Sequence, residues 1–146
     1  MKKEHIVSSN TWLYTKAIVA GAVLDTVCTM FVMMVLMLSL HESGLPEKEV
    51  FERMKSTNGL LLSLIIGLGC TVLGSYVAGR IARRSEMYLG MCVAAVGMVF
   101  GAFFRESGLP LWYDLAGFSA MLPCGIAGGR FAAAYNSDKK DGASLA

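Results

Sequence analysis

The segment Ser56–Gly79 contains no charged residue, and this constrains the fold of the chain more than any other feature. A helix of that length crosses the roughly 30 Å hydrocarbon core of a bilayer. Three further runs are also predominantly apolar: Ala17–Leu40, broken only by Asp25, then Met87–Phe104, and Leu115–Gly129 with Trp112 and Tyr113 before it. We therefore predict an all-α integral membrane four-helix bundle, with spans at about residues 17–40, 57–80, 87–104 and 112–130.

Composition supports a bilayer-embedded chain. Only 16% of the 146 residues are charged, against roughly 25% in an average soluble domain. The residues outside the apolar runs are too few to build a separate soluble core. We therefore expect one transmembrane domain over residues 1–146, in which the first run is a retained span and not a cleaved signal peptide.

The basic residues predict an orientation. Four spans place both termini on one side, and the Lys and Arg residues are more numerous there. That side carries Lys2, Lys3, Lys16, Arg80, Arg83, Arg84, Arg130, Lys139 and Lys140, and the other side carries Lys48, Arg53, Lys55 and Arg105. By the positive-inside rule both termini are cytoplasmic. Since topology accounts for these charges, we expect no nucleic-acid partner.

Two pairs of segments indicate an internal repeat. The pentapeptide Glu-Ser-Gly-Leu-Pro occurs at residues 42–46 and again at 106–110, each time after an odd-numbered span. The segment Ser75–Ala82 can be aligned with Gly125–Ala132 at the ends of the even-numbered spans. These matches predict two helical hairpins that form a parallel repeat about a two-fold axis along the membrane normal.

The first copy has additional residues after its pentapeptide. Pro46 suits the first position of a helix, acids follow it, and Arg53 and Lys55 come last, in the order that a helix dipole favours. Val50, Phe51 and Met54 share one face. Residues 46–56 are therefore expected to form a short amphipathic helix on the outer membrane surface, with a polar loop as the alternative.

Small residues recur every fourth position in the spans, a spacing that allows helices to approach closely in lipid. The predicted packing residues are Gly59, Ser63, Gly67, Thr71, Ser75 and Gly79 in the second span, Gly97 and Gly101 in the third, and Gly128 in the fourth.

Asp25 is the leading candidate for a functional residue. It lies about 13 Å along the helix axis from Lys16, near the bilayer midplane. An ionised side chain there costs at least about 2.5–3.5 kcal/mol, so the residue should face the bundle and have a partner. Two interpretations remain open: an ion or proton site, or an acid that fixes helix register.

The fourth span offers a second polar feature at a similar depth. Pro123 cannot donate a hydrogen bond to the Ser119 carbonyl, so an acceptor is freed within the membrane. Broken helices of this kind often form transport sites, although proline kinks also serve packing alone. We predict a polar centre made by Asp25, Ser119, Pro123 and Tyr76.

Two arginines occupy equivalent positions in the predicted repeat. Arg80 and Arg130 lie at the cytoplasmic ends of their spans, where they can line an inner vestibule or extend to lipid phosphates. Tyr76 lies one turn further in and can reach a charged neighbour or ligand through its hydroxyl.

No catalytic, metal or cofactor site is expected. The four cysteines fall one to each span without a CxxC pair, which argues against a thiol oxidoreductase. The Met30, Met33, Met34 and Met37 stripe has the MxxxM spacing of copper transporters, but packing explains it better. The histidines have no metal-ligand spacing, and we predict that the protein is not an enzyme.

The segment Gly74–Arg84, Gly-Ser-Tyr-Val-Ala-Gly-Arg-Ile-Ala-Arg-Arg, resembles a recurrent feature of small uncharacterised bacterial four-span membrane proteins. This resemblance implies a location in the bacterial cytoplasmic (inner) membrane and carries no activity with it. Two functional hypotheses follow: a small, oligomeric transport or permeation unit centred on Asp25, or an accessory or assembly subunit of a larger membrane complex. The expected partners are the lipid bilayer and either further copies of the chain or a larger membrane subunit.

Overall fold

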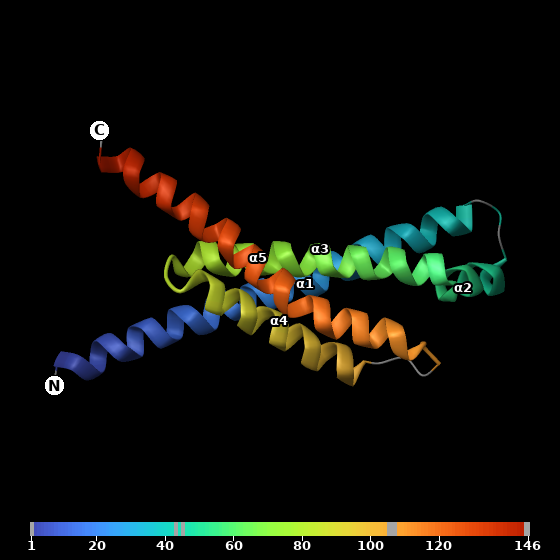
Figure 1. Cartoon of the computed structure of the whole chain (residues 1–146), viewed down its shortest axis with the longest axis horizontal. Helices are drawn as coiled ribbons and strands as arrows, with labels where there is room; N and C mark the ends of the chain where they lie inside the picture. Colours follow the sequence, from blue (N-terminus) through green and yellow to red (C-terminus); the bar gives the residue numbers. More distant parts are fainter. Residues whose placement is uncertain (1, 43, 45, 105–107, 145–146) are drawn as a thin grey trace.

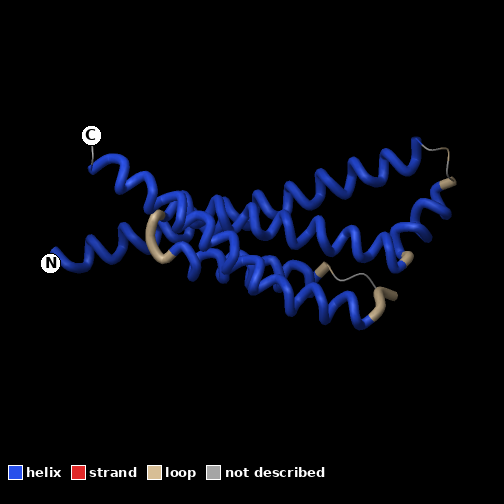
Figure 2. The backbone as a smooth tube through the Cα atoms, turned by 45° about the horizontal axis from the view of Figure 1, so that its top comes forward, coloured by secondary structure: helices blue, strands red, loops and turns tan. Residues whose placement is uncertain are grey.

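The computed structural model describes the backbone of residues 2–42, 44, 46–104 and 108–144, with side chains for most of residues 12–137. These residues form five α-helices and no strand (Figures 1 and 2). The helices are α1 (Lys2–Glu42), α2 (Glu47–Lys55), α3 (Thr57–Ala82), α4 (Glu86–Phe103) and α5 (Leu111–Ser144). The predicted all-α fold is confirmed for this part of the chain.

Three helices are long and apolar enough to cross a membrane, over Trp12–His41, Thr57–Ala82 and Glu86–Phe103. The long helix α5 is not among them. Its apolar stretch is bounded by Asp114 and Arg130 and is diluted by Ser119, Pro123 and several glycines. The described residues thus have the features of a polytopic membrane protein with three candidate spans.

The bundle is organised around α3, which packs against α1, α4 and α5. In the described residues the backbones of α1 and α4 approach within 8 Å of one another, whereas those of α1 and α5 do not. The start of α1 and the end of α5 lie at one end of the molecule, and α2 lies toward the opposite end together with the end of α4 and the start of α5 (Figure 1). Toward the α2 end, α1 diverges from α4 and α5 (Figures 1 and 2).

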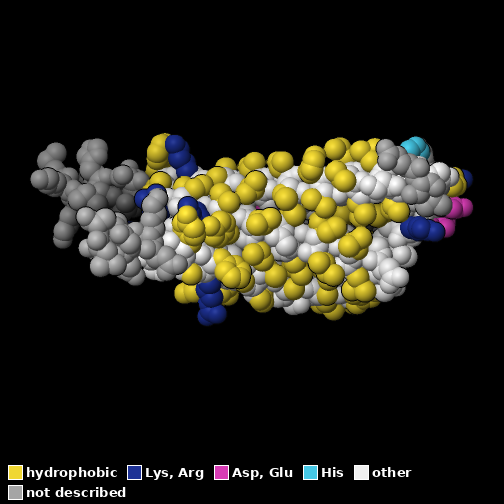
Figure 3. Space-filling view, turned by 90° about the horizontal axis from the view of Figure 1, so that it is seen from above, with side chains coloured by type: hydrophobic (Ala, Val, Ile, Leu, Met, Phe, Trp, Pro, Cys, Tyr) yellow, Lys and Arg dark blue, Asp and Glu magenta, His cyan; other side chains and the backbone are white. Residues whose placement is uncertain are grey.

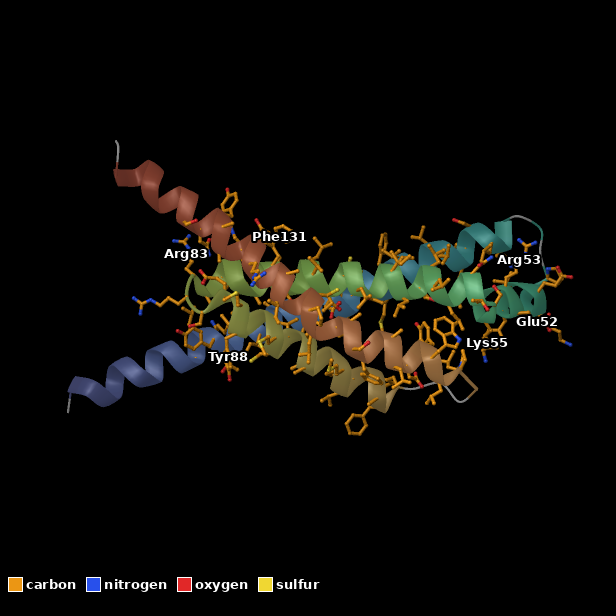
Figure 4. The ribbon with its side chains drawn as sticks, in the orientation of Figure 1. Glu52, Arg53, Lys55, Arg83, Tyr88 and Phe131 are labelled. Carbon is orange, nitrogen blue, oxygen red and sulfur yellow. The ribbon has the colours of Figure 1, made fainter. Side chains whose placement is uncertain are left out.

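Charged side chains gather toward the two ends of the bundle. On the face drawn in Figure 3, Lys and Arg side chains lie near each end, and the surface between them is mostly apolar. Arg83 marks the end that carries the termini, and Glu52, Arg53 and Lys55 mark the other (Figure 4). This distribution follows from the desolvation cost of charges in an apolar phase, which places them outside the apolar runs.

The two glycines of the repeated pentapeptide adopt the same kind of backbone conformation. Gly44 has φ +75° and Gly108 has φ +102°, a region that glycine enters without steric cost. A proline then precedes a helix in each copy: Pro46 comes before α2 and Pro110 comes before α5. The remaining pentapeptide positions at Ser43, Leu45, Glu106 and Ser107 lie outside the described residues.

The short helix α2 covers Glu47–Lys55, within the predicted range of 46–56. Pro46 does not occupy the first helical position, because its ψ of 148° is extended and it therefore precedes the helix. Val50 is buried, and the corner into α3 is tight: Ser56 accepts a hydrogen bond from Gly59 N at 3.3 Å and donates one to Arg53 O at 2.6 Å. This corner joins α2 firmly to the start of α3.

The first and last helices extend well beyond their apolar runs. α1 begins at Lys2 and α5 continues to Ser144. Residues 2–16 contain neither glycine nor proline, so nothing in the sequence stops the first helix from extending outward.

Candidate intramembrane polar site

The site lies beside a close crossing of α1 and α3, built from two glycines. A Cβ placed on Gly21 would lie 2.6 Å from the Gly74 carbonyl oxygen and 2.9 Å from Ala78 Cβ. A Cβ placed on Gly74 would lie 2.6 Å from the Gly21 carbonyl oxygen and 2.9 Å from Asp25 Cβ. Only glycine fits at either position, and this contact fixes where Asp25 meets α3.

A second crossing, between α4 and α5, has the same pattern of contacts. A Cβ on Gly90 would overlap the Gly125 carbonyl oxygen, and one on Gly125 would lie 2.5 Å from the Gly90 carbonyl oxygen and 2.8 Å from Ala94 Cβ. Gly90 also faces the Gly129 backbone. Gly21 and Gly74 therefore correspond to Gly90 and Gly125, and Asp25 corresponds to Ala94.

Asp25 is buried within the bundle, with 7% of its surface exposed. Thr71 of α3, which is 1% exposed, is its hydrogen-bonding partner. The Thr71 hydroxyl oxygen lies 3.3 Å from both Asp25 Oδ1 and Oδ2. The same hydroxyl lies 3.1 Å from the Gly67 carbonyl oxygen one turn away on α3. The acid thus faces inward and has a partner, as the sequence predicts.

The surroundings of this pair are small, weakly polar or apolar. The Cys70 thiol of α3 lies near the side chains of Cys28 and Thr29, which follow Asp25 on α1. On α4, a Cβ at Gly97 would lie 3.4 Å from Asp25 Oδ2 and 3.0 Å from Met121 Cε of α5. All four long helices therefore contribute residues to the site or to its wall.

Ser119 and Pro123 do not join Asp25 in the structure. Both side chains are exposed, and the Ser119 hydroxyl donates to the Ala116 carbonyl of its own helix at 3.2 Å. Pro123 lies in a shallow surface depression on α5 that also involves Arg130 and Phe131. Met121, which points inward between them, is the residue that α5 contributes to the site instead.

The two arginines of the predicted repeat occupy different environments. The Arg80 guanidinium stacks 3.7 Å from the ring centre of Tyr135 of α5, and the ring centre of Tyr76 lies 5.9 Å away. Tyr76 thus lies beside Arg80, and it is not among the described neighbours of Asp25, with which the sequence groups it. Arg130 is exposed. Arg80 therefore links α3 to α5, whereas Arg130 is available to lipid or solvent.

Apart from Thr71 and Ser63, the predicted packing residues fall into two groups. The first group lies against another helix. The backbone of Gly59 lies against α2, that of Gly79 against Ala132 of α5, that of Gly97 against Met121 of α5, and that of Gly128 against Ser75 of α3. The Ser75 hydroxyl donates to the Gly90 carbonyl of α4 at 3.3 Å. Ser63 is half-buried and donates to the Gly59 carbonyl of its own helix. Gly67 and Gly101 form the second group, because a Cβ at either would have no neighbour within 4 Å among the described residues.

The sequence does not predict a polar cluster that joins α3, α4 and α5 at the end with the termini. The Asn136 amide of α5 donates to Glu86 Oε1 of α4 at 3.1 Å and to the Gly79 carbonyl of α3 at 3.4 Å. Below it, Ala17, Ala82 and Leu89 form a buried apolar cluster. The sequence gives little indication of this contact, because Asn136 follows the last apolar run.

Within the described residues, no group of three or more His, Cys, Asp and Glu side chains is placed to hold a metal ion. Comparison of the chain with protein-family models, with curated proteins and with solved structures finds no match.

Proposed function

We propose that this protein is a small transport or permeation unit of a bacterial cytoplasmic membrane, with Asp25 and Thr71 as its polar centre. A buried acid within a candidate span is costly and is commonly retained for function. Here it lies between α1 and α3, with Gly97 of α4 and Met121 of α5 beside it.

One observation carries this proposal: an equivalent helix crossing exists without the acid. The contact between Gly90 and Gly125 has the pattern of the contact between Gly21 and Gly74, yet Ala94 stands where the first crossing has Asp25. When Gly74 of α3 is paired with Gly125 of α5, the position of Thr71 on α3 corresponds to that of Leu122 on α5. Because alanine satisfies the packing in the second hairpin, packing alone does not account for the acid in the first.

The proposed unit has four spans arranged as two parallel hairpins. The matched crossings and the positive φ angles of Gly44 and Gly108 support the repeat. The packing of α5 along both α3 and α4 supports its assignment as the fourth span, with Trp112 and Tyr113 in the interface. The excess of basic residues at the end with the termini supports a cytoplasmic location for that end and an outer-surface location for α2.

Charge movement across proteoliposomes tests the transport proposal. The purified chain is reconstituted, and currents are recorded after jumps in proton, sodium or potassium concentration. We expect a current with one of these cations that Asp25→Asn abolishes while the variant keeps the wild-type circular dichroism spectrum. The matched control is Thr26→Val, which removes an exposed hydroxyl that follows Asp25 and donates to the Ala22 carbonyl of its own helix, and it should keep the current. An unchanged current in folded Asp25→Asn removes Asp25 from the mechanism.

A second candidate function, an accessory subunit of a larger membrane complex, is favoured by the uncovered glycines. Gly67 and Gly101 have the small-residue character of helix interfaces but meet no other described helix. Native mass spectrometry after gentle extraction from the original membrane separates the two functions. A homo-oligomer alone favours transport, whereas a stoichiometric foreign subunit that is lost in Gly67→Leu favours the accessory role.

A further inference from the structure

The Thr71 hydroxyl has three oxygen neighbours and only one hydrogen to share among them. Asp25 Oδ1 and Oδ2 each lie 3.3 Å away, and the Gly67 carbonyl oxygen lies 3.1 Å away. A hydroxyl donates one hydrogen bond and accepts up to two, whereas an ionised carboxylate only accepts. The position of that one hydrogen therefore depends on whether the carboxyl group carries a proton.

With an ionised carboxylate, the Thr71 hydroxyl has one hydrogen to donate and more than one acceptor beside it. Thr71 can donate either to Asp25 or to the Gly67 carbonyl. If it donates to Gly67 O, the carboxylate loses this donor; if it donates to Asp25, Gly67 O keeps only the backbone hydrogen bond of helix α3. With a protonated carboxyl group, the Asp25 O–H donates to Thr71 Oγ1 and the Thr71 O–H donates to Gly67 O. The protonated arrangement satisfies both contacts and leaves no net charge among the buried residues, which is the less costly state in an apolar interior.

Among the residues that the structure describes, the other groups around Asp25 supply neither a counter-charge nor a set of metal ligands. On α1 and α3 the neighbouring titratable groups are the Cys28 and Cys70 thiols, and the other neighbours are Thr29 on α1, Gly97 on α4 and Met121 on α5. Hard metal cations take about six or more oxygen ligands. The oxygen atoms that the described contacts place at the site are the two of the carboxyl group and the hydroxyls of Thr71 and Thr29, with Gly67 O behind Thr71, which is fewer than such a cation takes.

We propose that the ion bound at this site is a proton, held on Asp25 as the carboxylic acid and donated in a hydrogen bond to Thr71. The inference deepens the proposed function, since it names the ion that a transport unit centred on Asp25 carries. Release of the proton leaves the carboxylate dependent on the Thr71 hydroxyl, which must then turn away from Gly67 O. Thr71 is thus the positioning residue that changes its hydrogen bond as the site loads and unloads.

Dicyclohexylcarbodiimide provides the test, because this apolar reagent reacts with protonated carboxyl groups in apolar surroundings. The carboxyl proton moves to a carbodiimide nitrogen, and the carboxylate oxygen adds to the central carbon. The O-acylisourea then rearranges to a stable N-acylurea, so the whole reagent mass is retained. The full chain is treated in proteoliposomes and analysed by intact mass and peptide mapping, with Asp25→Asn as the unlabelled control.

We expect one adduct on Asp25 at neutral pH. Its rate of formation should fall about tenfold for each pH unit once the site loses its proton, and replacing choline with sodium at constant pH should not change it. Absence of labelling at Asp25 overturns the proposal, and so does protection by sodium, which would identify a metal-cation site.

This experiment separates the inference from the proposed function. Labelling of Asp25 without any current in liposomes supports the proton site and refutes transport. A current that depends on Asp25, together with sodium protection, supports transport and refutes the proton.

Discussion

Replacement of Gly21 by alanine should destabilise the bundle through steric overlap at the crossing of α1 and α3. The new Cβ would lie 2.6 Å from Gly74 O, 2.9 Å from Ala78 Cβ and 3.0 Å from Val93 Cγ2. Two of these neighbours are a backbone atom and an alanine methyl group, so no flexible side chain can move away to relieve the overlap. Separation to an ordinary contact of about 3.4 Å requires the helices to move apart by about 0.8 Å.

Overpacking of this kind costs about 1–3 kcal/mol. Gly101→Ala is the matched control, because it adds the same methyl group to a helix where no described atom lies within 4 Å. The intrinsic helix preference of alanine over glycine then cancels in the comparison. A difference of about 2 kcal/mol changes the unfolding equilibrium constant about 30-fold.

Unfolding by sodium dodecyl sulfate in mixed micelles, followed by circular dichroism, measures this difference. Gly21→Ala should unfold at a lower detergent fraction than Gly101→Ala. Equal stability of the two variants would refute the glycine crossing as the element that holds α1 against α3.

Three further predictions concern contacts around the site and at the end with the termini. Mercuric ion should bridge Cys28 and Cys70 within one chain, because the two thiols lie near one another. Titration with a thiol reagent should show that mercury blocks both thiols, and Cys28→Ser should make Cys70 reactive again. Unchanged reactivity of the two thiols after mercury treatment would contradict the contact. Tyr135→Leu should cost about 0.5–1 kcal/mol in the same unfolding assay through loss of the ring beneath Arg80, while Tyr135→Phe should cost little; equal effects of the two would argue against stacking. Asn136→Ala should cost about 1–2 kcal/mol and speed proteolysis of the end of α5, because Glu86 and the Gly79 carbonyl lose their donor; unchanged cleavage would indicate that the link is weak.

The sequence predicts the helices well and their rotation poorly. The four apolar runs coincide with parts of α1, α3, α4 and α5 to within one residue at their ends, because long apolar segments can satisfy their backbone groups in lipid only as helices. Hydropathy says little about which face of such a helix turns inward, since the spans are apolar all round. The face of each helix that turns inward has to be predicted from the small residues and from the few polar residues within the spans.

That limit explains the outcome for the predicted polar centre. Asp25 faces inward because a buried acid must avoid the apolar exterior, and depth along the chain suffices to predict this. Ser119 and Pro123 were grouped with it by depth alone, but they occupy the outer face of α5, and Met121 faces inward instead. Thr71 was predicted as a packing residue, and its hydroxyl is the partner of the acid.

The sequence pattern also does not predict which residues of the two helix crossings correspond to one another. Alignment of the pentapeptides pairs Gly21 with Ser85, whereas the contacts pair it with Gly90. The predicted alignment of Ser75 with Gly125 is displaced by one residue, because the contacts pair Gly74 with Gly125. The pentapeptides sit in the connections, where length can vary without moving the helices, so they do not fix the register within the spans. The glycine pairs do so, since only a Gly–Gly contact allows the backbones to approach this closely.

The stability of Asp25→Ala tests the central claim most directly, because that claim holds that the acid serves binding and not the fold. The substitution installs the residue that occupies the equivalent position in the second hairpin, Ala94, which is fully buried. We expect a folded protein at least as stable as the wild type in mixed micelles, since a buried polar group is removed and the glycine crossing is kept. Loss of about 3 kcal/mol or more would show that Asp25 is a structural residue and would contradict the account.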